Sequence, residues 1–99
     1  MGHRPRATSF DPHYAKHGEI IRALRENRVM SVSQLARETG MKRTAIDGIE
    51  GGATDDDGNI RPTRRIDVIE MCKLADALNI SHHELFDALT AEYRKDRNG

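Results

Sequence analysis

Hydrophobic side chains recur through the middle of this chain every three to four positions, which is the spacing of an amphipathic α-helix. The pattern predicts helices over residues 16–28, 33–39, 42–50 and 65–78, and a fifth helix that starts after Ser81 and continues past Tyr93. The apolar positions expected to face the core are Ile20, Ile21, Leu24, Leu35, Ala36, Ile46, Ile49, Val68, Met71, Cys72, Ala75, Leu78, Leu85, Phe86 and Leu89. Five helices with polar connections predict an all-α fold.

The two ends and one internal segment lack this periodicity. Residues 1–15 contain two prolines and are expected to form a flexible N-terminal arm, and residues 94–99 are expected to form a frayed C-terminal tail. Residues 51–64 hold three glycines, a proline and three consecutive aspartates, which predicts a long loop. A chain of 99 residues has room for one domain, which we place at residues 16–93.

Residues 33–50 have the features of a helix-turn-helix. Ala36 is a small residue where two steeply crossed helices would meet, Gly40 lacks the Cβ that opposes a left-handed turn, and Ile46 anchors the second helix. Further along, residues 81–84 (SHHE) form a capping box, a signal for the start of the fifth helix.

The segments IRALRENRVMS, SQLARETGMKRTAIDGIEGG and CKLADALNISHHELF resemble the phage repressor and Cro-like family of DNA-binding domains, also called Xre-like. The resemblance covers about residues 18–86. It implies a compact five-helix bundle of the lambda-repressor-like type, a recognition helix at residues 42–50 that enters the major groove, and binding to operators as a dimer. It also implies that Arg25 and Glu50 form an ion pair across the bundle.

Charge qualifies this picture, because the chain has 16 basic and 16 acidic residues whereas a DNA-binding domain is expected to be basic. The charges are unevenly distributed. Residues 16–52 carry seven basic and five acidic side chains, residues 61–66 carry three arginines and no acid, and residues 67–89 carry one lysine and five acids. This predicts a basic half that faces DNA and an acidic back. A solvated surface of mixed sign is the alternative.

Side chains near the start of the recognition helix are the expected readers of base sequence. Arg43 can form two hydrogen bonds with guanine, Thr44 offers a hydroxyl and a methyl group, and Asp47 can accept from the amino group of cytosine. Val32 stands near the position where many family members place a DNA-contacting glutamine, and it can touch a thymine methyl group or simply pack. Gly48 replaces a residue that is often polar, which removes a contact. The alternative is that the cations here are only solvated, but cations at a helix start oppose the helix dipole, which favours a role toward DNA.

Contacts with DNA phosphates are expected from Lys42, Ser33, Arg61, Arg64 and Arg65. Arg4 and Arg6 on the arm could add a contact in the minor groove, or the arm could be a tail without a role. The aspartates at residues 55–57 are expected to keep the tip of their loop away from DNA.

The sequence gives little support for a metal site or for catalysis. Asp55, Asp57 and Asn59 alternate like calcium ligands, but Ile66 stands at the twelfth position, where a calcium loop needs glutamate. The five histidines are scattered, no pair of cysteines has zinc-ligand spacing, and no catalytic triad or phosphate-binding glycine loop is present. We therefore expect no metal, no cofactor and no enzymatic activity.

The expected function is a sequence-specific transcriptional regulator that binds double-stranded DNA, and the alternative is a protein-interaction module or an antitoxin on the same fold. A homodimer on a palindromic operator is expected, with Leu89, Tyr93 and the region of Ile80 as the interface; alternatively these residues only cap the bundle. The single Cys72 excludes an internal disulfide, and no apolar run reaches the length of a membrane span. A cytoplasmic protein without a membrane partner is expected.

Overall fold

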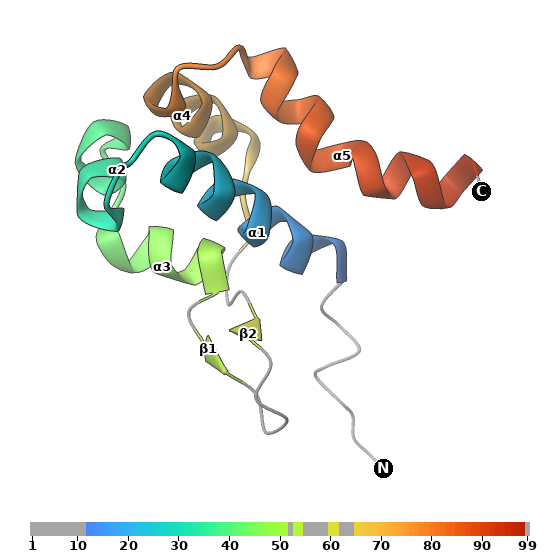
Figure 1. The fold of residues 1–99 in the computed structure, drawn as a ribbon, viewed down its shortest axis with the longest axis horizontal. Coiled ribbons are helices and arrows are strands. Elements are labelled where there is room, and N and C mark those ends of the chain that lie inside the picture. Colours follow the sequence, from blue (N-terminus) through green and yellow to red (C-terminus); the bar gives the residue numbers. More distant parts are fainter. Residues whose placement is uncertain (1–11, 52, 55–59, 62–64, 99) are drawn as a thin grey trace.

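The computed structural model describes residues 12–51, 53–54, 60–61 and 65–98. The elements within these ranges are α1 (Pro12–Asn27), α2 (Val32–Thr39), α3 (Arg43–Gly51), β1 (Ala53–Thr54), β2 (Ile60–Arg61), α4 (Val68–Leu78) and α5 (His82–Asn98). Figure 1 shows the helices around one core, with the two strands below α3. The all-α prediction with five helices is confirmed for the described residues, and a short antiparallel hairpin is added to it.

The core lies where the five helices meet and consists of aliphatic side chains. Its buried members are Ile21, Met30, Leu35, Ala36, Ile46, Ile49, Leu74, Ala75, Leu78, Leu85 and Leu89. Helix α1 packs against α3 and α5, and α4 packs against α2 and α5. Gly18 permits the close approach of α1 to α3, because a Cβ atom at this position would collide with the carbonyl oxygen of Ile49.

The turn between α2 and α3 has the predicted form. Gly40 adopts a left-handed conformation with φ of 77°, and its backbone N–H donates to the carbonyl oxygen of Ala36 over 2.9 Å. Thr39 Oγ1 donates to the carbonyl oxygen of Leu35 over 2.9 Å and accepts from the backbone N–H of Met41 over 3.1 Å. The buried hydroxyl therefore supports the corner that sets the angle between the two helices.

Side-chain caps determine where the last two helices begin. Asp67 and Glu70 form a capping box, which starts α4 at Val68 and not at the expected residue 65. The predicted capping box before α5 is present, with Ser81 Oγ accepting from the backbone N–H of Glu84 over 2.9 Å and Glu84 Oε1 accepting from that of Ser81 over 3.0 Å.

The ends of the outer helices differ from the expectation. Helix α1 begins four residues early, at Pro12, whose fixed φ suits the first turn of a helix. It ends before Val29, which has φ of 56° and a side chain that is 89% exposed. Helix α5 continues to Asn98, through residues that were expected to fray. The flexible arm was expected at residues 1–15, but residues 12–15 form the first turn of α1, so that part of the prediction is wrong. Residues 1–11 of the expected arm lie outside the described residues.

Two side chains expected in the core are not there. Val68 is 71% exposed because it is the first residue of α4, where α4 and α5 leave a pocket between them. Phe86 is 50% exposed because it follows the buried Leu85 by one residue, which turns it about 100° around α5. Both side chains line a pocket described below.

Candidate DNA interface

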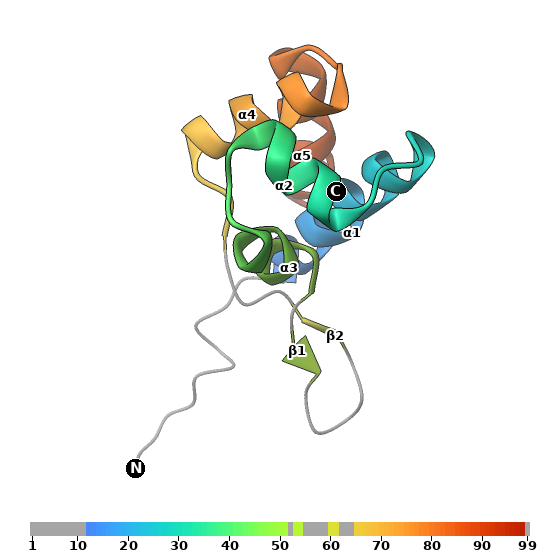
Figure 2. The ribbon, with the colours of Figure 1, turned by 90° about the vertical axis from the view of Figure 1, so that its left-hand side faces the viewer.

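Helices α2 and α3 lie together at the front of the molecule in Figure 2. The inner side of α3 is buried through Ile46, Ile49 and Glu50. Its outer side carries Arg43, whose side chain is 65% exposed, and Asp47, whose side chain is 49% exposed. A helix with one face in the core and a polar face in solvent has the geometry that the predicted recognition helix requires.

The three recognition-helix residues expected to read bases share this exposed side. Thr44 is exposed and lies one residue after Arg43 and three before Asp47. Gly48 stands at a position that was also expected to face DNA. It is buried instead, on the inner side of α3. The chemistry available to bases is therefore a guanidinium, a hydroxyl with a methyl group, and a carboxylate.

Arg43 has partners on both helices of the motif. Its Nη1 donates to Ser33 Oγ over 3.0 Å, which links the start of α3 to the start of α2. Its Nε lies 3.9 Å from Asp47 Oδ2, one turn further along α3. From the sequence, Arg43 is expected to read bases and Ser33 to contact a phosphate, and their contact with each other is not predicted.

The remaining predicted contact residues at this face differ in their exposure. Lys42 and Ser33 are exposed. Val32 is half-buried and packs against the core, so only part of its surface remains open to a thymine methyl group.

The structure brings Arg25 and Glu50 together as the expected pair. Arg25 Nε and Nη2 donate to the two carboxylate oxygens of Glu50, each over 2.8 Å, and Nη1 donates to the carbonyl oxygen of Met30 over 2.7 Å. Glu50 is 7% exposed. The hydrogen bond with Glu50 is the largest cause that raises the pKa of Arg25 above its ordinary value.

Arg22 adds a second cation to this pair. It donates to the backbone carbonyl oxygen of Glu50, and its Nε lies 3.8 Å from Glu50 Oε1. Glu50 stands near the C-terminal end of α3, where a negative charge opposes the helix dipole. Two arginines from α1 compensate that charge and fix the end of α3 against α1.

Three of the predicted phosphate contacts follow α3 in the sequence. Arg61 belongs to strand β2, Arg64 lies outside the described residues, and Arg65 is exposed. The calcium-like residues at 55–59 also lie outside the described part of the chain. Among the described residues, no group of three or more histidine, cysteine, aspartate or glutamate side chains could hold a metal ion.

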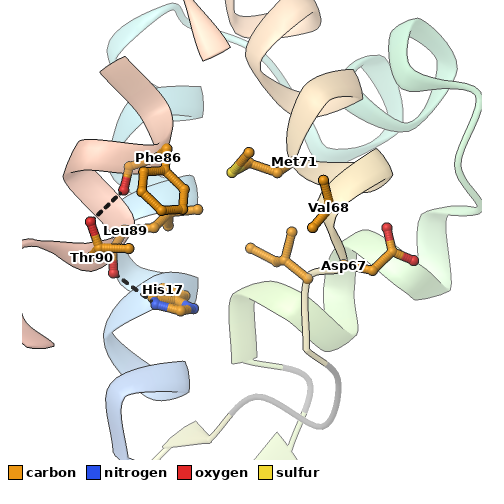
Figure 3. A pocket seen from close by; sticks show the side chains of 8 residues that line it. His17, Asp67, Val68, Met71, Phe86, Leu89 and Thr90 are labelled. Atoms are coloured by element: carbon orange, nitrogen blue, oxygen red, sulfur yellow. Dashed lines mark hydrogen bonds between the residues drawn. The ribbon is translucent and has the colours of Figure 1, made fainter. Parts of the chain in front are cut away.

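A pocket of about 230 Å³ opens between α4 and α5. In Figure 3, Phe86, Leu89 and Thr90 line one wall, Val68 and Met71 the opposite wall, and His17 from α1 the floor. The carbonyl oxygen of Leu89 lies 2.8 Å from His17 Nε2, so α1 also anchors this part of α5.

The two residues expected in a dimer interface have different environments. Leu89 is 7% exposed and belongs to the core, as its place in the apolar pattern predicts, so it has little surface for the expected dimer interface. Tyr93 is 48% exposed, on the last turns of α5, which extend beyond the other helices in Figure 1. Ile80 is partly buried against the core. No described helix is both long and apolar enough to cross a membrane.

Solved structures of two restriction-modification controller proteins are similar to this chain. No protein-family model and no curated protein matches the sequence. The restriction-modification controller protein C.AhdI from Aeromonas hydrophila is 30% identical, with a TM-score of 0.63, and the match covers 77% of this chain and 100% of that chain. A mutant of the restriction-modification controller protein C.Esp1396I has the same fold, with 24% identity, a TM-score of 0.66, and coverage of 86% of this chain and 95% of that chain.

Proposed function

Since the chain belongs to the Cro/C1-type, or Xre-like, helix-turn-helix family of DNA-binding regulators that includes the controller protein C.AhdI, we propose that it is a sequence-specific transcriptional regulator. Its structural neighbours are regulators and not enzymes, which confirms the expectation that it is not an enzyme. In this proposal α3 enters the major groove of double-stranded DNA. Because the similar protein C.AhdI is a restriction-modification controller protein, DNA near restriction-modification genes is where the binding sites of this chain should be sought first.

The observation that carries the proposal is the exposed side of α3. Arg43, Thr44 and Asp47 point outward from a helix whose inner side is buried and whose end is held by Arg25 and Glu50. Rigidly held donors and acceptors on one helix face can distinguish base pairs in the major groove.

Phosphate contacts complete the proposed interface. Lys42 and Ser33 flank the base-reading side chains at the starts of α3 and α2. Arg61, Arg64 and Arg65 follow α3 in the sequence and are assigned to the backbone of the same duplex. These contacts would position the protein without reading sequence.

Selection of bound sites from random duplex DNA, followed by affinity measurements, tests the proposal. Arg43→Ala is expected to cost roughly 1 to 3 kcal/mol on the selected duplex and to flatten the preference at one base pair. Lys73→Ala, which removes an exposed positive charge from α4, is the control. Failure of the selection to yield any preferred sequence would refute sequence-specific binding.

A homodimer on a palindromic site is part of the proposal, because one recognition helix contacts only about half a helical turn of DNA. Because Leu89 is buried, we assign the interface to exposed apolar side chains. These are Val68 and Phe86, which line the pocket, and Tyr93 further along α5. Phe86 and Tyr93 are seven residues apart and therefore lie on nearly the same stripe of α5.

Analytical ultracentrifugation of Phe86→Glu tests this interface. The variant is expected to sediment as a monomer at concentrations where the original protein is a dimer, because a charge cannot be buried there without a partner. Val29→Glu is the matched control, since Val29 is also apolar and is 89% exposed, but it follows the C-terminal end of α1 and does not line the pocket. A dimer that survives Phe86→Glu, or a protein that is monomeric with and without DNA, would exclude this interface.

The protein-interaction module is the second candidate, and the apolar pocket is the observation that favours it. The two candidates differ in their response to salt. A DNA-binding regulator releases counterions and loses affinity for duplexes as salt rises, whereas an interaction module without DNA binding has no duplex affinity to lose.

A further inference from the structure

Ser33 and Arg43 are ten residues apart and lie on different helices, yet their side chains meet on the outer side of the motif through the 3.0 Å hydrogen bond described above. We propose that Ser33 is a positioning residue that orients Arg43 for reading a guanine. The proposal rests on the proposed function, because it needs Arg43 to be a base-reading residue. It assigns Ser33 a role in sequence preference in addition to the expected phosphate contact.

Arg43 needs such support because of where it lies. Its side chain is long, 65% exposed and located in the first turn of α3. Ordering a flexible arginine on binding costs conformational entropy, which reduces both affinity and the discrimination between bases. A contact that exists before DNA arrives removes part of that cost.

Ser33 is well placed to give that support. It is in the first turn of α2, directly after the N-cap Ser31 and Val32, and Ser31 Oγ accepts from the backbone N–H of Gln34 over 3.0 Å. Its short side chain has few rotamers to lose. On the other side of the guanidinium, Asp47 Oδ2 lies 3.9 Å from Nε. The guanidinium is thus located between one group on α2 and one on α3.

The contact leaves the chemistry for a base intact. A guanidinium has five N–H groups, and a bidentate contact with the O6 and N7 atoms of guanine uses two of them. Ser33 takes one hydrogen of Nη1, so the other hydrogen of Nη1 and both hydrogens of Nη2 remain. Ser33 acts here as an acceptor, and its own hydroxyl proton stays available for a phosphate oxygen.

A role in stability does not account for this arrangement. The Arg43 and Ser33 side chains are exposed, and a hydrogen bond between exposed groups adds little to folding. The Arg43 and Asp47 pair has the cation before the anion along the helix, which is the less favourable order for helix stability.

The test is a double-mutant cycle on the full chain. Affinities are measured by fluorescence anisotropy on the selected duplex and on a duplex with adenine in place of the guanine whose preference is lost in Arg43→Ala. Ser33→Ala is expected to reduce the preference for guanine about three- to tenfold, the range of one hydrogen bond. Ser33→Thr keeps the hydroxyl and is expected to restore the preference. In the Arg43→Ala background, Ser33→Ala is expected to leave the remaining base preference unchanged.

His82→Ala is the matched control, because His82 Nε2 lies 2.8 Å from Asp76 Oδ1 in an exposed side-chain contact between α5 and α4, and neither residue belongs to α3 or lines the pocket. An equal loss on both duplexes, with or without Arg43, would assign Ser33 to phosphate contact alone and overturn the inference. An unchanged guanine preference in Ser33→Ala would also overturn the inference. The same holds if Arg43→Ala loses no preference for any guanine of the selected site. In each of these cases the original protein still selects a sequence, so the proposed function stands. It fails separately if the original protein selects none.

Discussion

Arg25→Ala is expected to be among the most damaging single changes outside the aliphatic core. It removes two hydrogen bonds to Glu50 and one to the carbonyl oxygen of Met30. The carboxylate of Glu50, in a residue only 7% exposed, would keep Arg22 as a cation at 3.8 Å. Breaking a buried ion pair costs about 3 to 5 kcal/mol, and the remaining arginine places this case near 3 kcal/mol. For a domain of this size, that corresponds to a fall in melting temperature of roughly 12 to 24 °C.

Urea unfolding followed by circular dichroism measures this loss. Arg22→Ala is the control, because the Arg22 side chain is 35% exposed and that of Arg25 only 11%, so its removal is expected to cost about 1 kcal/mol. The double variant Arg25→Met with Glu50→Leu is expected to recover most of the stability, because it removes both buried charges. An Arg25→Ala protein as stable as Arg22→Ala would refute the assignment of Arg25 as the main partner of Glu50.

Three further changes test the scaffold and the interface. Gly18→Ala is expected to lower the free energy of unfolding by about 2 kcal/mol in urea titrations, because the added methyl group meets backbone of α3 that cannot rotate away; an unchanged midpoint would contradict that close approach. Val29→Gly is expected to raise the free energy of unfolding by up to about 1 kcal/mol in the same assay, since glycine relieves the left-handed strain and little packing is lost; destabilisation would show that Val29 packs usefully. Arg65→Ala is expected to weaken binding to all duplexes alike and to reduce the slope of log affinity against log salt by about one; a loss confined to the selected duplex would make Arg65 a base contact.

Local signals along the sequence account for most of the fold. Gly40 predicts the left-handed turn of the motif, and Ser81 with Glu84 predicts the start of α5, because each signal acts within a few residues of backbone. The capping box of Asp67 and Glu70 carries the same kind of signal and would have corrected the start of α4. Val29 could not be predicted as the residue that follows the end of α1, because valine disfavours the left-handed conformation that it adopts there.

The parts that could not be predicted depend on how the helices cross. Leu89 and Phe86 both follow an apolar pattern, but the position of α1 buries the first and leaves the second at the edge of a pocket. The strands β1 and β2 have two residues each, too few to show alternation. The contact between Ser33 and Arg43 requires the angle between α2 and α3, which no spacing in the sequence contains.

The balance of 16 basic and 16 acidic residues bears on how the proposed regulator would find its site. A strongly basic protein gains affinity for any duplex through counterion release, and that gain does not depend on sequence. A neutral chain has a weaker long-range attraction to DNA, so more of its affinity must come from contacts that fit one sequence. Side chains ordered before binding make such contacts at a lower entropic cost. In the proposed regulator, the contact of Arg43 with Ser33 and the buried Arg25–Glu50 pair would therefore serve the same end, which is to present few DNA contacts in a fixed geometry.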